Sequence, residues 1–598
     1  MTKKYLALAL GAMLVCGGAM AQKKKQAQPE YNGGITPEMM QQMKKGFGGN
    51  ASDKALRNIM VNQSPAKLAM NYENATKFDS HFSNRVVSKA VTDQKSSGRC
   101  WMFTGMNVLR NQAIRNHHLP ADFQFSQAYL FFYDQLEKSN LFLQAMIDTY
   151  KKPLNDQEVE WLFKNPIGDG GQFTGVANLI DKYGLVPADV MPETYNTNNT
   201  SSISNLIALK LREDGLELRR LAANKYVLPS ELQKKKTEML TEIYRMLALT
   251  MGEPPAQFTW QQKDAKGEIV ETKTYTPMEF YEKFAKTDFS KYYMVMNDPT
   301  REYYKVYEIQ YDRHVYDGQN WRYLNLPMED IAPMCIASIK DSTMMYFSCD
   351  VGKFLNRDNG LMDMNNYDYE SLMGTTFGMD KKQRVATFAS GSSHAMTLCA
   401  VDLDKDGKPL KWMVENSWGP NYGWQGNLIM TNDWFNEYMF RVVLEEKYIP
   451  ANILSLMKQE PIMLPAWVEK LFGASVAVIS LTTLITTVAG FLDLSLPRWA
   501  VWAIGIVNMI SLPLLIYSTV KSLRDKARAT REAARKAAGK AVAVKAGDIA
   551  KLAAGESGAA EPKAEGPVKV RPKPHPQQLA AKKAASGNRP KKGKKKKK

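Results

Sequence analysis

The sequence predicts an α+β protein, in which a mainly helical first half precedes a strand-rich second half. Up to about residue 250 the apolar residues recur at helical spacing, as in "FSQAYLFFYDQLEKSNLFLQAMIDTY" and "SELQKKKTEMLTEIYRMLALTM". From about residue 257 short alternating runs such as "KWMVENSW" and "GNLIMT" are separated by turn signals. Helices and strands that are segregated along the chain in this way are typical of the α+β class.

Residues 1–21 have the order of a secretory signal peptide. Lys3 and Lys4 precede an apolar run that ends in the small-residue motif "AMAQ". We therefore expect cleavage after Ala21 and export to the periplasm or the extracellular space; the alternative is an N-terminal helix that the protein keeps. Residues 22–48 are rich in Lys, Gln and Gly and are predicted to form a linker.

The predicted globular domain spans residues 49–467 and contains the four cysteines that remain after cleavage. These cysteines, Cys100, Cys335, Cys349 and Cys399, lie far apart and match no metal-ligand spacing, so the sequence predicts no metal site. Cys335 and Cys399 lie among apolar residues and are expected in the core. The sequence leaves open whether any pair is bridged.

The stretch "TDQKSSGRCWMF", residues 92–103, is polar at its start and abruptly apolar at its end. It lacks the alternation of a strand and predicts a loop, a tight turn at Gly98 and then the first turn of a buried helix. Cys100 would then lie at a helix N-terminus, where the backbone dipole lowers the pKa of a thiol and favours the thiolate. The sequence therefore indicates a candidate nucleophile.

A cysteine nucleophile needs a base, and His394 is the histidine that best fits this role. It begins the apolar run of "SGSSHAMTLCAV", and Asn416 follows 22 residues later in "ENSWGPNYGWQG". A lone histidine is more often structural, but an asparagine amide holds an imidazole in one tautomer, and Trp418 would shield that bond. Gln94 can supply a side-chain N–H beside the Cys100 backbone N–H to bind an oxyanion. The other five histidines lie in polar or mixed surroundings or in the tail and have no partner signature: His81, His117, His118, His314 and His575.

These motifs resemble those of the papain-like cysteine peptidases. The shared pattern is "Q-x5-C-W", a later "S-H-A" and then "E-N-S-W-G". Within that clan the chain is similar, over about residues 50–467, to the bleomycin hydrolase or aminopeptidase C family. The blocks that carry this resemblance, in order, are "DQKSSGRCW", "IGDGGQF", "KYGLVPADVMPETY", "MGEPPAQFTW", "KWMVENSWG" and "TNDWFNEYMFRVVLEEKYIP". The separation of 294 positions from Cys100 to His394 also suits a family with large insertions.

The resemblance implies a papain-like cysteine peptidase core with large helical insertions and assigns the catalytic roles. Cys100 would be the nucleophile and His394 the general base and then the general acid. Asn416 would orient the histidine, and Gln94 would donate to the oxyanion. The presence of all four argues against the alternative of an inactive family member.

The same resemblance implies the mode of substrate binding and the assembly. Gly170 and Gly171 would be the pair whose bare backbone binds an extended peptide substrate. The family implies aminopeptidase activity with broad side-chain tolerance, a barrel-shaped homohexamer, and neither a metal nor an organic cofactor.

The chain departs from this family after Trp467, because 131 further residues follow. In the family the chain ends near this point, and its terminal carboxylate captures the free amino group of the substrate. We therefore expect a weakened aminopeptidase preference and impaired hexamer assembly unless the extension is removed by cleavage near Trp467.

The extension is predicted to form a two-helix transmembrane hairpin over residues 468–520 and a disordered basic tail over 521–598. Two uncharged runs of 22 residues, both within 471–520, are each long enough to span a bilayer; the alternative is a pair of buried core helices. The tail carries 24 basic and 6 acidic side chains, which accounts for the whole net charge of +18. Residues 1–520 are therefore neutral, which argues against nucleic acid binding by the body of the protein.

The predicted topology conflicts with itself, because a signal peptide followed by two spans leaves the basic tail outside, against the positive-inside tendency. We favour a fusion of unrelated sequence as the origin of the extension. The rival function is a membrane-anchored peptidase homologue with altered activity, either endopeptidase or lost, whose basic tail binds anionic lipid or nucleic acid.

The segment "DLDKDGKPL" begins like a calcium-binding loop, with Asp402, Asp404, Asp406 and Gly407. Its twelfth position is Met413 instead of glutamate. The sequence therefore predicts a polar hairpin turn and no calcium site.

Overall fold

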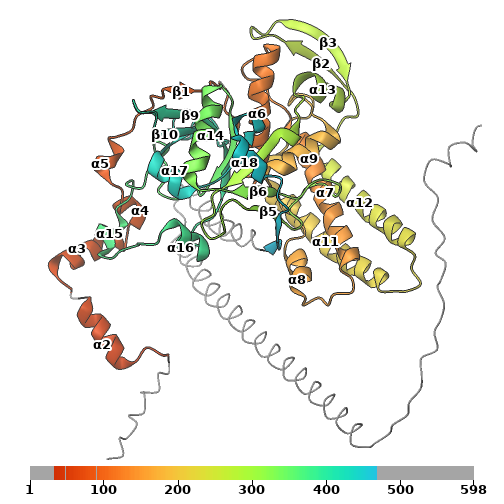
Figure 1. Ribbon diagram of the computed structural model, residues 1–598. Helices are drawn as coiled ribbons and strands as arrows, with labels where there is room; N and C mark the ends of the chain where they lie inside the picture. The colour runs from red at the N-terminus through yellow and green to blue at the C-terminus, as the bar shows by residue number, and fades with distance from the viewer. Residues whose placement is uncertain (1–32, 48, 89, 468–598) are drawn as a thin grey trace, which may run out of the picture. The chain divides into compact units, whose positions relative to one another are not determined.

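The computed structural model describes residues 33–467 except positions 48 and 89 (Figure 1). The predicted signal peptide, transmembrane hairpin and basic tail all lie outside the described residues. Within the described part of the chain, no helix is long and apolar enough to cross a bilayer.

The first half of the described chain is helical, as predicted. Its main helices are α6 (Cys100–His117), α7 (Gln127–Asp148), α8 (Gln157–Lys164), α9 (Phe173–Tyr183), α11 (Thr200–Ala222) and α12 (Pro229–Met251). The Ser126 side chain caps α7 by accepting the N–H of Tyr129, and Pro229 begins α12, where its missing N–H has no cost. Helices α7, α11 and α12 pack against one another, and α9 packs on both α6 and α7.

The second half forms an 11-stranded mixed sheet in the order β13-β5-β6-β4-β12-β7-β9-β10-β11-β8, with β1 paired to β9. The strands are β1 (Asn84–Arg85), β4 (Tyr292–Met296), β5 (Val306–Ile309), β6 (Arg322–Asn325), β7 (Met345–Cys349), β8 (Leu361–Met362), β9 (His394–Leu403), β10 (Pro409–Glu415), β11 (Asn427–Thr431), β12 (Met439–Glu445) and β13 (Ile462–Leu464). Strands β7, β9, β10 and β11 pair antiparallel in succession. The runs "KWMVENSW" and "GNLIMT" supply β10 and β11, which confirms their prediction as strands.

Helices also interrupt the strand-rich half, so its prediction as mostly strands holds only in part. They are α13 (Pro277–Phe284), α14 (Met328–Lys340), α15 (Tyr369–Met373), α16 (Lys381–Ala386), α17 (Asn432–Tyr438) and α18 (Ala451–Leu456), with the 3-10 turns η1 (Phe289–Lys291) and η2 (Glu446–Tyr448). A separate hairpin consists of β2 (Phe258–Lys263) and β3 (Ile269–Tyr275). The shorter N-terminal helices are α2 (Pro37–Gly46), α3 (Ala51–Met60), α4 (Pro65–Leu68) and α5 (Tyr72–Ala75), and α10 (Tyr195–Asn198) precedes α11. Helix α2 lies within the segment that the sequence predicts as a linker.

Two apolar clusters form the core and meet at helix α6. One gathers side chains of α6, α7, α9, α11, α12 and α13, and the other gathers those of β7, β9, β10, β11, α14 and α17. Helix α6 contacts β7 and β9, so its first residue lies where the helical part meets the sheet. Cys335 and Cys399 are buried in the second cluster, as predicted, and all four described cysteines are free thiols.

The segment "DLDKDGKPL" is the turn between β9 and β10, which confirms the prediction of a hairpin. The Oδ1 atom of Asp404 accepts the backbone N–H groups of Asp406 and Lys408, and Gly407 has a φ of +78°. The carboxylate of Asp404 therefore stabilises the turn by accepting these two backbone hydrogen bonds.

Candidate active site

Cys100 is the first residue of α6, as the sequence predicts, and the turn before it is held by a carboxylate. The backbone N–H of Gly98 donates to Oδ2 of Asp169 at 2.6 Å. A Cβ atom at position 98 would lie 2.3 Å from Oδ1 of the same carboxylate, so only glycine allows this close approach. Asp169 also accepts the hydroxyl of Thr200 at 2.5 Å. The turn that presents the thiol is therefore anchored to residues that lie far along the chain.

Burial sets the protonation of the two candidate catalytic groups. It raises the pKa of the Cys100 thiol to about 11, although the nearby backbone N–H groups of Ala395 and Trp101 act in the opposite direction. Burial also lowers the pKa of His394 to about 4, opposed by its hydrogen bond to Asn416. The prediction that the helix N-terminus favours the thiolate is thus wrong for the thiol on its own, because lost hydration outweighs the N–H groups. A thiolate here needs a cation such as the imidazolium of His394 to stabilise it, since opposite charges attract strongly at low dielectric.

His394 and Asn416 come from neighbouring strands and are hydrogen-bonded. His394 begins β9, Asn416 directly follows β10, and the two strands pair antiparallel, with Glu415 opposite Thr397. The Nε2 atom of His394 lies 2.7 Å from Oδ1 of Asn416, and both side chains are buried. Because Oδ1 accepts, Nε2 carries the proton and Nδ1 is left as the basic atom.

Trp418 covers the histidine. Its ring stacks on the imidazole of His394 with centroids 4.6 Å apart and the planes 27° apart. Tyr422 in turn packs edge-on against Trp418 at 4.8 Å. The indole therefore lies where a shield of the His394–Asn416 bond is predicted.

Gln94 is held by the segment that carries Asn416. Its backbone N–H donates to the Ser417 carbonyl at 2.9 Å, and its Oε1 accepts the Ser417 hydroxyl at 2.6 Å. Its Nε2 donates to the Ser97 carbonyl at 2.6 Å, which leaves the second hydrogen of the amide for another acceptor. Gly426 packs against Val91, so the two segments, more than 300 residues apart, run side by side.

The two predicted substrate-binding glycines differ in their surroundings. A Cβ at Gly170 would meet nothing within 4 Å, so this residue has open space beside it. A Cβ at Gly171 would lie 2.3 Å from Cε1 of His314 and 2.7 Å from Cε2 of Trp101. Glycine is thus needed at position 171 because the side chains of His314 and Trp101 occupy the space that a Cβ atom would take. The sequence did not reveal this reason.

His314, for which the sequence shows no partner signature, has a buried partner in the structure. Its Nδ1 lies 2.6 Å from Oδ1 of Asp134, which is fully buried in α7 and also binds Nζ of Lys138 at 2.9 Å. The only signal in the sequence was the spacing of four between Asp134 and Lys138 on a helix. Nothing in the sequence joined His314 to this pair, because 180 positions separate it from Asp134.

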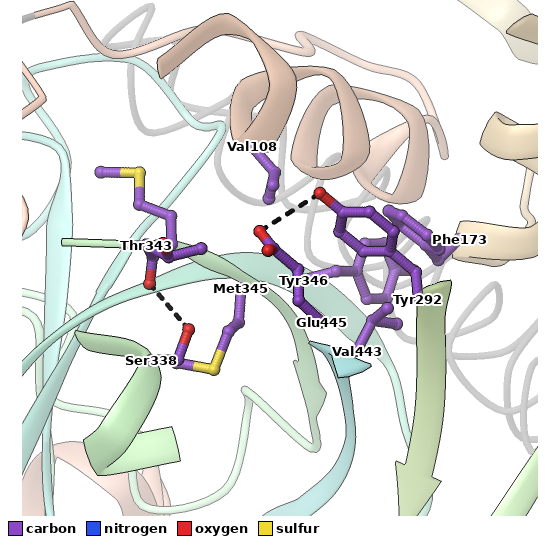
Figure 2. Close-up of a pocket in the computed structure, with 10 residues that line it drawn as sticks. Val108, Phe173, Tyr292, Ser338, Thr343, Met345, Tyr346, Val443 and Glu445 are labelled. Carbon is purple, nitrogen blue, oxygen red and sulfur yellow. Dashed lines mark hydrogen bonds between the residues drawn. The ribbon is translucent and has the colours of Figure 1, made fainter. Parts of the chain in front are cut away.

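A cavity beside α6 is too small to hold a peptide (Figure 2). Val108 of α6, Tyr292, Tyr346 and Glu445 line it, and the hydroxyl of Tyr292 donates to Oε1 of Glu445 at 3.3 Å. Its volume of about 10 Å³ is at the lower limit for one water molecule. Within the described chain, no group of three or more His, Cys, Asp or Glu side chains is placed to hold a metal ion.

Comparison with known proteins identifies the family of this chain. The model of the Peptidase C1-like family matches residues 34–469. Bleomycin hydrolase of Homo sapiens is 39% identical over 388 residues, which cover 63% of this chain and 85% of that protein. Aminopeptidase G of Lactobacillus delbrueckii subsp. lactis is 36% identical over 433 residues, which cover 72% of this chain and 98% of that protein. The crystal structure of PepW from Lactobacillus rhamnosis superposes with a TM-score of 0.70 at 34% identity and covers 73% of this chain and 98% of that one. The chain therefore belongs to the Peptidase C1-like family and has its papain-like fold.

Proposed function

We propose that the protein is a cysteine aminopeptidase, which hydrolyses N-terminal residues from peptides through the thiol of Cys100. The observation that carries this proposal is the buried hydrogen bond from Nε2 of His394 to Asn416, which leaves Nδ1 as a base. The N–H of Ala395, the residue after the histidine, lies at the Cys100 thiol and so links the two groups. The relatives named aminopeptidase and bleomycin hydrolase support the reaction class.

In the first half of the reaction, Nδ1 of His394 takes the proton of the Cys100 thiol while the sulfur attacks the scissile carbonyl carbon. The oxyanion of the tetrahedral intermediate accepts the backbone N–H of Cys100 and the free side-chain N–H of Gln94. The intermediate collapses when the C–N bond breaks, and His394 gives its proton to the departing amine. The product is a thioester between the N-terminal residue and Cys100.

In the second half, water replaces the departed peptide. His394 takes a proton from the water as the oxygen attacks the thioester carbon, and the C–S bond then breaks. The sulfur recovers the proton, and the free amino acid leaves. Asn416 holds the same imidazole tautomer in both halves, and Trp418 keeps water from the bond between them.

The test is hydrolysis of an aminoacyl fluorogenic substrate and of its N-blocked twin by the full-length chain. A Cys100→Ala variant is the control. We expect cleavage of the free-amine substrate and its loss in the variant. Cleavage of both substrates at the same rate would indicate an endopeptidase instead of an aminopeptidase. Activity that survives in Cys100→Ala would exclude the thiol mechanism.

The same assay on a chain that ends at Trp467 tests the role of the extension. We propose that the extension weakens the preference for free amines and the assembly of a homohexamer. The shortened chain should then discriminate better between the two substrates and should have a larger mass by light scattering. Equal discrimination and an equal number of subunits for both chains would contradict this part of the proposal.

A further inference from the structure

In the glycine loop, residues 168–171, three successive carbonyl groups accept hydrogen bonds from the side chains of two residues. Nζ of Lys138 donates to the carbonyls of Gly168 at 2.9 Å and of Gly170 at 2.7 Å. Between them, Nε1 of Trp101 donates to the carbonyl of Asp169 at 2.8 Å. The peptide planes of the loop are therefore fixed by donors that belong to α6 and α7.

This binding determines where the N–H groups of the loop point. In a trans peptide the C=O and the following N–H point in opposite directions. Because the Gly170 carbonyl faces Lys138, the N–H of Gly171 faces away from it, and the N–H of Gly170 likewise faces away from Trp101. A Cβ atom at Gly170 would meet no other atom within 4 Å, so there is open space beside the loop at this residue. The loop thus directs the N–H groups of Gly170 and Gly171 away from Trp101 and Lys138, and Gly170 itself is exposed.

Lys138 is itself held by a buried group. Its Nζ binds Oδ2 of Asp134 at 2.9 Å, and the other oxygen, Oδ1, binds Nδ1 of His314 at 2.6 Å. Nε2 of Gln135 also reaches Oδ2 of Asp134, at 3.0 Å, and the Gly168 carbonyl at 3.1 Å. Burial alone would raise the pKa of Asp134, but Lys138 and His314 outweigh it and keep that pKa low. Asp134 is therefore a carboxylate that fixes the lysine and the histidine together.

His314 joins this group to the loop and to the residue after the nucleophile. Its ring lies against Trp101 with centroids 4.6 Å apart, and Nζ of Lys138 lies 5.4 Å from the same indole ring. The edge of the imidazole fills the place of a side chain at Gly171. Burial and the charge of Lys138 lower the pKa of His314, so it is neutral and donates its Nδ1–H to Asp134.

We infer that Asp134, Lys138 and His314 form a positioning group, which holds the glycine loop so that the N–H of Gly171 binds the backbone of a peptide substrate. This inference rests on the proposed function and concerns how the substrate binds. The group touches neither the thiol nor the scissile bond, so it acts through residues 168–171. Its loss should weaken peptide binding and leave the intrinsic reactivity of Cys100 in place.

The test is a Lys138→Met variant of the full-length chain, assayed with a free-amine peptide. We expect KM to rise about tenfold and kcat to change much less, because two charge-assisted hydrogen bonds to the loop are lost. The rate of Cys100 alkylation by iodoacetamide, which needs no peptide binding, should stay at the wild-type value. Lys138→Arg keeps the positive charge and can still donate hydrogen bonds to two carbonyl groups. It should therefore bind the peptide more tightly than Lys138→Met does.

Lys182→Met is the matched control. Lys182 lies in α9 and binds Glu137 of α7 at 2.8 Å and Asp317 at 3.0 Å, so this change also removes a lysine ion pair from α7. It should leave KM unchanged. A wild-type KM in folded Lys138→Met, or an equal loss of peptide hydrolysis and of alkylation in that variant, would overturn the inference. An inactive wild-type protein would instead count against the proposed function.

Discussion

The imidazole of His394 and the amide of Asn416 form a buried hydrogen bond of 2.7 Å between Nε2 and Oδ1. Oδ1 of Asn416 also accepts the N–H of Ser417 at 2.8 Å, so the amide is fixed in one orientation. The bond therefore selects the histidine tautomer whose Nδ1 is basic. The proposed mechanism depends on this selection in both halves of the reaction.

Replacement of Asn416 should slow the chemical step. In Asn416→Ala the Nε2–H of His394 loses its acceptor in a buried site, and the ring is free to turn. We expect kcat to fall about 100-fold, in the range found for general acid–base groups, with little change in KM. Steady-state kinetics with an aminoacyl fluorogenic substrate measure this. A kcat within twofold of the wild-type value would show that Asn416 does not orient the base.

Replacement of Gln94 should remove one donor to the oxyanion. We expect Gln94→Ala to lower kcat about 100- to 1000-fold. Ser417→Ala removes only the hydroxyl that holds Oε1 of Gln94 and should cause a smaller loss. If the Ser417 variant loses as much activity as the Gln94 variant, the amide has a structural role instead.

The thiol of Cys100 should become unreactive at neutral pH when its base is removed. In His394→Ala no imidazolium can form, and the raised pKa of about 11 then governs the thiol. Because only the thiolate is nucleophilic and little of it forms far below the pKa, alkylation by iodoacetamide should be slow at pH 7 and should increase as the pH approaches 11. The wild-type protein, in which His394 can accept the proton, should react faster at pH 7. Equal rates for the two proteins at pH 7 would contradict the pairing of thiol and imidazole.

The turn before Cys100 should depend on a buried ion pair. Arg99 is fully buried, and its guanidinium binds Glu193 through two hydrogen bonds of 3.0 and 2.7 Å. Glu193→Ala leaves this charge without an anionic partner, and we expect the free energy of unfolding to fall by about 3 kcal/mol in urea titrations. Glu217→Ala, which breaks an exposed pair with Arg220, is the control and should change nothing measurable. Equal effects of the two variants would mean that the Arg99–Glu193 pair does not stabilise the turn.

The sequence predicted the parts of the site that follow one another along the chain. The helix start at Cys100, the strands that flank His394 and Asn416, and the hairpin after Asp402 all left local patterns of spacing and turn residues. The pKa of the thiol was predicted in the wrong direction, because the helix N-terminus is a local feature and burial is not. The partner of His314 was missed for the same reason, since Asp134 is brought to it only by the packing of α7.

The most direct test of the central claim is to map the residue that a thiol-reactive aminoacyl ketone modifies in the full-length chain. Digestion and mass spectrometry distinguish Cys100 from Cys335, Cys349 and Cys399, which are buried. We predict an adduct on Cys100 alone, formed faster by the free-amine ketone than by its N-acetylated twin. An adduct on another cysteine, or none on Cys100, would contradict the account.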